Sequence, residues 1–245
     1  QYAGSFVLAR YGRNFYLLFH DGKKYQKMIL TNAIFPEKID KTSIDFAKAM
    51  HEKYYLPLIA LVEEMDTLRK TYKDKTDYHN EAELPKLLEA NYLPKFKDMV
   101  LSFALENISK EDSVTVAALK AMVENAYRRT QKYVDWKDYK FALCEQRAAL
   151  HKTTWPCSRD YFDSKVLYEN FYSKLTTGTD ITTITAETIQ KVEVGQGYSD
   201  LLELFHAPGS LLQESDFDYQ YQWKCDEASI TVAINQYGIV EKIIA

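Results

Sequence analysis

The chain has 245 residues, of which 46% are hydrophobic and 27% are charged, a composition typical of a soluble protein that buries a substantial core. Its net charge of −4 gives no overall positive field for a phosphate backbone, so we do not expect nucleic acid to be a partner. No run of the sequence approaches the roughly 20 apolar residues that a membrane-spanning helix requires. We therefore expect membrane association only through a leader or lipid anchor that is absent from this chain.

Two turn signals near the N-terminus predict a small antiparallel sheet. The runs SFVLARY, FYLLFH and KYQKMIL are rich in β-branched and aromatic residues, and the turns GRN and DGK separate them. Asp21-Gly22 favours a tight hairpin because glycine adopts a positive φ without steric cost. We expect a three-stranded meander over residues 5–31.

The next segment has the spacing of apolar residues, three and four apart, that is typical of amphipathic helices. It predicts a bundle of helices over residues 43–72, 84–103, 113–150 and 158–175. Pro57 and Pro94 lie inside the first two helices. Each should bend or break its helix, because proline lacks a backbone N–H.

A threonine-rich run, TTGTDITTIT, follows the fourth helix. Short polar side chains of this kind are typical of a boundary between domains. The sequence thus predicts the meander and the bundle in residues 1–178 and a separate module in residues 179–245. The expected fold class is α+β.

The predicted module combines a short helix with alternating strands. A glycine turn, the amphipathic run YSDLLELF and the break Pro208-Gly209 come first. In the later run SITVAIN, Ile230, Val232 and Ile234 point to one side, as in a strand with one buried face. The aromatic residues of YQYQW also share one face, either in the core or on a recognition surface.

This pattern over residues 184–245 resembles the BamE/SmpA family of small outer-membrane lipoproteins, and it is also similar to the repeat of β-lactamase inhibitory proteins. The matching features are Val194-Gly195, the helix, Pro208-Gly209, Trp223 at the end of an aromatic strand, and Tyr237-Gly238. His206 departs from the pattern, because such modules usually have a glycine at this helix end. The resemblance implies a helix pair on one face of an antiparallel sheet, no catalytic machinery, and protein recognition in the cell envelope or outside the cell.

We predict that the module has a core of its own. Its members should be Leu201, Leu204, Phe205, Trp223, Ile230, Val232 and Ile239. Each is apolar and lies on the expected inner side of the helix or a strand.

The run LQESDFDYQYQW holds the candidate binding residues Phe217, Asp218, Tyr219 and Tyr221. Aromatic side chains among carboxylates would form a hot spot with an acidic rim, suited to a partner that carries lysine or arginine. The alternative is a soluble loop beside core tyrosines. Exposure of Phe217 or Tyr219 distinguishes the two.

No motif predicts a catalytic residue, a metal site or a cofactor. The histidines are scattered without metal-binding spacing, and each is best explained as a surface or capping residue; they are His20, His51, His79, His151 and His206. Phosphate-binding loops and a nucleophile elbow are also missing from the sequence. Cys144 and Cys157 could meet in a helical hairpin and form a disulfide, whereas Cys225 has no evident partner.

We therefore expect a non-catalytic bacterial cell-envelope or secreted protein that binds another protein through its C-terminal module. Two alternatives stay open. One is an enzyme with a site between bundle and module that uses tyrosines with one histidine or cysteine, and a deep polar pocket there would favour it. The other is a structural subunit of a larger assembly, which helical stripes too apolar for one chain would favour.

Overall fold

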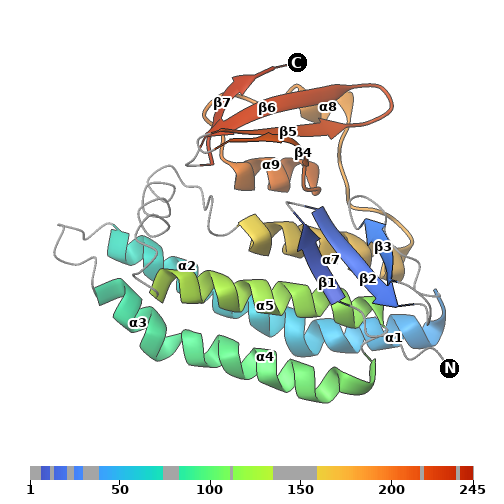
Figure 1. The fold of residues 1–245 in the computed structure, drawn as a ribbon, viewed down its shortest axis with the longest axis vertical. Coiled ribbons are helices and arrows are strands. Elements are labelled where there is room, and N and C mark those ends of the chain that lie inside the picture. Colours follow the sequence, from blue (N-terminus) through green and yellow to red (C-terminus); the bar gives the residue numbers. More distant parts are fainter. Residues whose placement is uncertain are drawn as a thin grey trace.

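The computed structural model describes residues 7–11, 14–20, 25–29, 39–73, 83–110, 113–134, 159–215, 218–235 and 238–244. These residues form an N-terminal antiparallel sheet, a bundle of long helices and a C-terminal module with a second antiparallel sheet (Figure 1). The predicted α+β fold class is confirmed.

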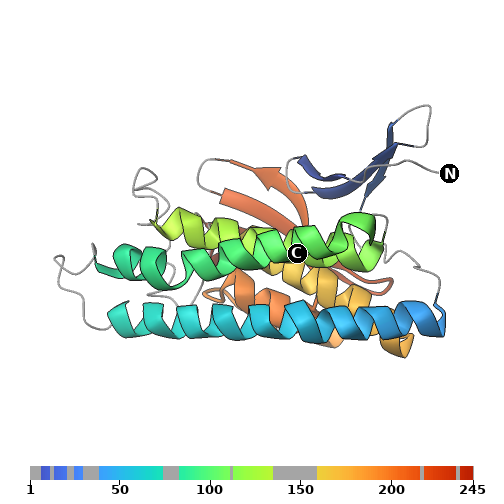
Figure 2. The same ribbon diagram turned by 90° about the horizontal axis from the view of Figure 1, so that it is seen from below.

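The N-terminal sheet contains β1 (Val7–Tyr11), β2 (Asn14–His20) and β3 (Tyr25–Ile29), in that order and antiparallel. The predicted meander is confirmed over these ranges. Figures 1 and 2 both place it toward the end of the bundle at which α1 begins.

The first part of the bundle is a long helical rod, made of α1 (Lys41–Met50), the π-helical turn η1 (His51–Tyr55) and α2 (Leu56–Lys73). The Asp40 side chain starts it by accepting a hydrogen bond from the Ser43 N–H at 2.9 Å.

Pro57 does not bend or divide this rod, which runs nearly straight in Figure 2. Instead, the Leu56 N–H bonds to the His51 carbonyl five residues back, so the hydrogen-bond pattern changes just before the proline. The wider π-turn accommodates a residue that has no N–H donor. The expectation of a bend or break at Pro57 was therefore wrong, although the helix does depart locally from α geometry there.

The second predicted helix is two helices, α3 (Glu83–Asn91) and α4 (Leu93–Asn107), followed by the 3₁₀ turn η2 (Ile108–Lys110). The break at Tyr92 puts Pro94 in the first turn of α4, where its missing N–H is tolerated. The predicted break at Pro94 is confirmed.

The described part of the bundle also contains α5 (Val114–Val134) and α7 (Arg159–Thr177). The predicted continuation of the third helix to residue 150 lies outside the described residues. So do Cys144 and Cys157, and the disulfide predicted between them stays a prediction. Cys225 is a free thiol. The bundle core holds large side chains from all these helices, among them Tyr54, Leu58, Leu88, Phe96, Phe103, Leu119 and Tyr168.

The C-terminal module begins with α8 (Ala186–Ile189) and α9 (Tyr198–Phe205) and continues into the sheet. Its strands β4 (Ser210–Glu214), β5 (Asp218–Lys224), β6 (Ser229–Asn235) and β7 (Val240–Ile243) are antiparallel and lie in sequence order. Short local bonds fix the two helix starts: Thr185 and Thr188 form a capping box, and the Gly197 N–H donates to Asp200 at 2.8 Å.

The predicted core of this module is confirmed except at one position. Leu201, Leu204, Phe205, Trp223, Ile230 and Val232 belong to a single cluster, to which Ile189 of α8 also packs. Ile239 is not a member. A register shift between Ala233 and Ile234 brings Val240 opposite Ile234, so Val240 takes the buried place instead.

The bundle core and the module core share helix α7. Tyr161 and Tyr168 belong to the bundle core, Val166 belongs to the module core, and Phe162 packs against both. Figure 1 shows the resulting layers: the sheet, then α9, then α7, then the other helices of the bundle. The threonine-rich run after α7 therefore joins two parts that are also packed on each other.

We predict that Gly209→Ala destabilises the protein. A Cβ at this position would lie 2.8 Å from two ring atoms of Trp223, whose ring is buried and whose Nε1 donates to the Ala207 carbonyl at 2.8 Å. Because this ring has no room to shift, the free energy of unfolding should fall by about 1–3 kcal/mol, measured by chemical denaturation. An unchanged value would show that the Trp223 ring moves freely.

We predict that His206→Gly stabilises the protein. His206 ends α9 with φ 46° and ψ 35°, the left-handed conformation that glycine adopts most easily. Relief of about 1–2 kcal/mol of strain exceeds the added entropy of the unfolded chain, for a net gain of about 0.5–1 kcal/mol.

His206→Ala is the matched control, because it removes the imidazole but keeps the Cβ. It should give no gain in a thermal denaturation experiment. An equal gain from alanine and glycine would contradict the strain explanation.

Candidate functional site

The candidate binding residues on β5 do not form one exposed surface. Tyr221 is only 2% exposed, and Tyr219 is half-buried and packs against the same core. Both tyrosines lie on the same side of β5 as Trp223, and this side faces α9. Asp218 is exposed, and Phe217 lies outside the described residues. A binding surface on β5 can use Asp218, but Tyr221 has no exposed area to offer.

The opposite side of this sheet carries polar and small side chains. We call it the outer sheet face and define it by Gln213, Gln220, Gln222, Thr231, Ala233 and Lys242, which register places on one side. Gln222 Nε2 donates to Thr231 Oγ1 at 3.3 Å, and Gln213 and Lys242 are exposed. Thr231 is only 7% exposed, so a partner would reach mainly the glutamine amides and Lys242 of this face, and amide groups make adaptable hydrogen bonds in protein interfaces.

The two edges of the sheet differ. The segment before α9 pairs with the β7 edge of the sheet. The Gly195 N–H donates to the Val240 carbonyl at 2.8 Å, and the Val240 N–H donates to the Gln196 carbonyl at 2.9 Å. At the β4 edge the register shifts between Leu211 and Gln213, and Leu212 is 54% exposed. Such a bulge disfavours unspecific pairing with another strand.

The inner side of the module is bonded to the bundle through α7. The Tyr198 hydroxyl donates to Asp163 Oδ1 at 2.5 Å, and the Asn170 side-chain amide donates to the His206 carbonyl. Thr182 Oγ1 donates to the Asn170 side-chain oxygen at 3.3 Å. Asp163 and Asn170 are buried, so these bonds satisfy polar groups that water does not reach. The inner side is thus occupied by intramolecular packing.

A buried ion-pair network supports α7 from the bundle side. Asp66 Oδ1 accepts from Arg129 at 2.7 Å and from Arg69 at 2.9 Å, and the Arg129 guanidinium lies over the rings of Tyr161 and Phe162. Burial alone would raise the pKa of the Asp66 carboxyl, but the two arginines outweigh it and hold that pKa below its usual value. The network positions α7, and both arginines are buried while the Asp66 side chain, 23% exposed, is paired with them.

The most unusual titratable cluster surrounds His51 in η1. Its imidazole lies between two tyrosine rings, with centroid distances of 4.3 Å to Tyr55 and 4.0 Å to Tyr172. His51 Nδ1 is 3.2 Å from the Tyr168 hydroxyl, and the Tyr55 hydroxyl donates to the Glu169 carboxylate. Since Tyr168, Glu169 and Tyr172 belong to α7, this cluster joins η1 to α7.

The cluster holds its imidazole and its phenols in their neutral forms. Burial lowers the pKa of His51 more than the nearby carboxylates of Glu169 and Glu52 raise it. Burial is also the main cause that raises the pKa of the Tyr55 and Tyr168 phenols. Near pH 7 the cluster therefore contains a neutral imidazole among protonated phenols.

His51 is the C-cap residue of α1, in line with the sequence interpretation of a surface or capping histidine, but that interpretation missed the contacts of its ring. The residue is half-buried in a ring stack. A signal was present in the spacing, since His51 and Tyr55, and Tyr168 and Tyr172, are each four residues apart and so lie on one helix face. Nothing in the sequence indicated that these two faces meet.

Groups with metal-binding potential are not found among the described residues. None of the helices in the described part of the chain combines the length and apolar character needed to cross a bilayer. Comparisons with family models, curated proteins and solved structures find no match for this chain.

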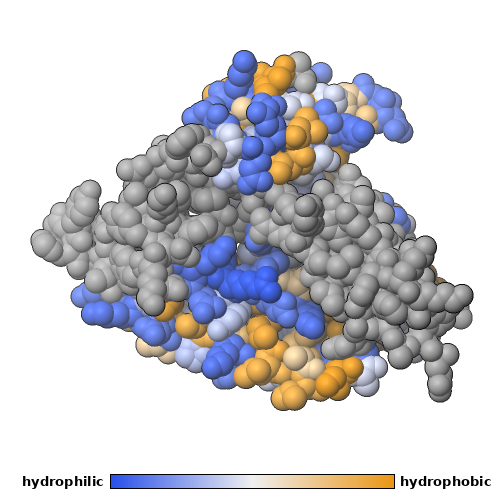
Figure 3. Space-filling model, in the orientation of Figure 1, coloured by the Kyte–Doolittle hydropathy of each residue, from blue (hydrophilic) through white to orange (hydrophobic). Residues whose placement is uncertain are grey.

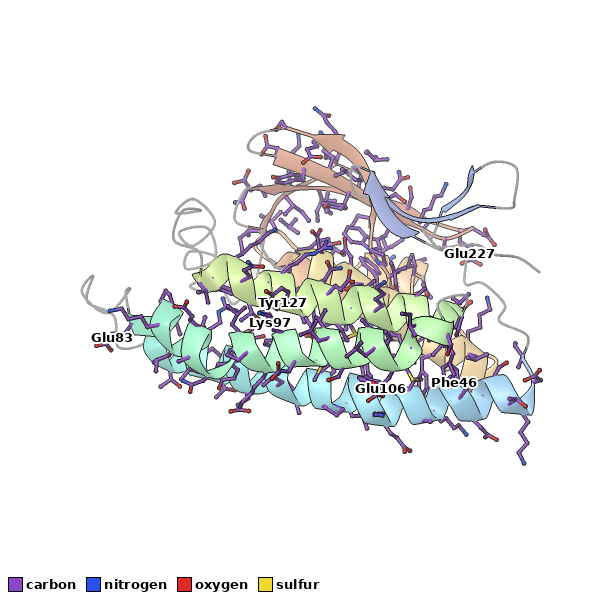
Figure 4. The ribbon with its side chains drawn as sticks, turned by 60° about the horizontal axis from the view of Figure 1, so that its bottom comes forward. Phe46, Glu83, Lys97, Glu106, Tyr127 and Glu227 are labelled. Atoms are coloured by element: carbon purple, nitrogen blue, oxygen red, sulfur yellow. The ribbon has the colours of Figure 1, made fainter. Side chains whose placement is uncertain are left out.

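We predict that Tyr198→Phe destabilises the protein. The change leaves the buried Asp163 carboxyl without the Tyr198 hydroxyl, which should lower the free energy of unfolding by about 1–3 kcal/mol in chemical denaturation. Tyr127→Phe is the matched control, because this half-buried tyrosine, labelled on α5 in Figure 4, has no side-chain hydrogen bond within the described part of the chain. Equal effects of the two changes would contradict a role for the Tyr198 bond.

Proposed function

We propose that this is a non-catalytic protein of the bacterial cell envelope or a secreted protein, and that it binds another protein through its C-terminal module. The observation that carries the proposal is the difference between the two sides of the module. Its inner side is packed on α7 through Val166, Asp163 and Asn170, while polar side chains cover the outer sheet face. A partner would bind the outer sheet face, with Asp218 at one end.

The location is proposed from the sequence resemblance to outer-membrane lipoproteins and β-lactamase inhibitory proteins. The helix α9 packed on one side of a four-stranded antiparallel sheet is consistent with that resemblance. Those families use such modules for protein recognition.

The enzyme alternative has less support. A site between bundle and module would need convergent polar groups around an accessible space. In the described residues, Asp163 and Asn170 at this boundary are instead bonded to Tyr198 and to the His206 carbonyl. The cluster of tyrosines with one histidine lies between η1 and α7, and its Tyr168 belongs to the bundle core.

Site-specific photo-crosslinking tests the proposal. A crosslinker at Gln220 on the outer sheet face should capture a protein of defined mass in envelope or culture fractions. The same crosslinker at Lys97 on α4, which Figure 4 places on the bundle away from the module, should not capture it.

The identified partner should then bind the purified protein. We expect Gln213→Arg combined with Asp218→Ala to weaken binding at least about tenfold, since both side chains are exposed at the proposed surface. Lys97→Glu and His51→Gln should leave the affinity unchanged. Parental affinity of the first variant, or loss of binding in His51→Gln, would contradict the proposal.

A second candidate function, a structural subunit of a larger assembly, is favoured by the surface of α4. Leu101, Leu105 and Ile108 follow one another at helical spacing and are 51%, 75% and 70% exposed. Figure 3 shows hydrophobic residues gathered over the C-terminal half of α4. Stripes of this kind commonly pack against another helix.

Sedimentation experiments distinguish this candidate. An assembly subunit should sediment as a larger particle, and Leu105→Glu should reduce that particle to single chains. A parental protein that sediments as a single chain in its native extract would remove the candidate.

A further inference from the structure

We propose that the contact between η1 and α7 around His51 is an acid-sensitive latch, which controls how firmly α7 and the module packed on it are held to the bundle. The latch is independent of which partner the module binds. It rests on the geometry of the ring stack and on the two-sided packing of α7.

The stack joins the two helical elements through one imidazole. His51 and Tyr55 come from η1, and Tyr168 and Tyr172 come from α7. The imidazole is nearly parallel to the Tyr172 ring, with an interplanar angle of 10°. A neutral imidazole can accept the hydrogen bond of the Tyr168 hydroxyl at an unprotonated Nδ1.

The groups that act on this imidazole come from both elements. On its own element Glu52 favours the charged form, and on α7 Glu169 does the same. The Glu169 carboxylate already accepts from the Tyr55 hydroxyl and lies 3.6 Å from Lys165 Nζ, so part of its charge is offset. The Tyr55, Tyr168 and Tyr172 phenols face the ring as neutral groups, and burial of the ring outweighs the two carboxylates.

Protonation changes both the hydrogen bond and the charge of the stack. Where the neutral ring accepts at Nδ1, protonation turns Nδ1 into a donor, and the hydroxyl of the fully buried Tyr168 must then accept. A positive charge also enters a partly desolvated position. Because the pKa of His51 is lower in the folded protein than in the unfolded chain, the contact is fully stable above the unfolded pKa. Its stability declines as the pH falls from there toward the folded pKa.

Helix α7 connects the latch to the module. Tyr168 belongs to the bundle core. Two residues before it, Val166 belongs to the module core, and two residues after it, the Asn170 amide donates to the His206 carbonyl. Any displacement of α7 at the stack therefore acts on the contacts of α9. Such a local opening lowers the protection of backbone amides in α7 and β6 against hydrogen exchange.

Hydrogen exchange of the full chain tests the latch. Between about pH 7.5 and about pH 5.5, corrected for the intrinsic exchange rate, protection in α7 and β6 should fall at least about threefold. In His51→Phe, which keeps an aromatic ring but cannot be protonated, the protection of α7 and β6 should stay constant over this pH range. In His206→Ala, which removes another histidine, it should fall as in the parent.

His51→Gln is the second variant, also without a titrating group, and serves if phenylalanine does not fold. An NMR titration of the His51 ring should place its midpoint below the ordinary histidine range. A fall in protection that is equal in the parent and the His51 variants would overturn the latch, as would constant protection in the parent. A fall in α7 without one in β6 would overturn the connection to the module.

Discussion

The burial of α7 on both sides is the constraint on which the rest of the structure depends. One side supplies Tyr161 and Tyr168 to the bundle core, and the other supplies Val166 to the module core. A helix in this position must also bury polar groups, here Asp163 and Asn170, and each buried polar group needs a partner. The module provides those partners, so its position on the bundle is fixed by hydrogen bonds as well as by apolar contact.

This constraint also decides which surfaces remain for function. Because α9 lies between the sheet and α7, the aromatic side of β5 is used for packing, with Trp223 against Phe205 and Tyr221 against Tyr198. The recognition that we propose would therefore use the polar outer sheet face and Asp218. The same constraint makes the contact of α7 with η1 important, since a change around His51 reaches a helix on which the module rests.

Much of the fold could be predicted from local patterns, because strand alternation and helical spacing depend on near neighbours. The side of β5 that holds Trp223 and the break before Pro94 are examples. The β7 register was missed, because a bulge puts Val240 rather than Ile239 in the core. The second buried side of α7 was not predicted, because it includes the polar residues Asp163 and Asn170, whereas local patterns indicate a buried side by its apolar residues. The His51 cluster required two helices to meet, and no local pattern specifies that contact.

Native-state hydrogen exchange at increasing denaturant concentration tests the shared role of α7 most directly. If α7 joins the two cores into one cooperative unit, the slowest amides of α5 in the bundle and of β6 in the module should exchange with the same free energy and the same denaturant dependence. A separate, lower free energy for β6, with its own smaller denaturant dependence, would show that the module unfolds alone and would contradict the account.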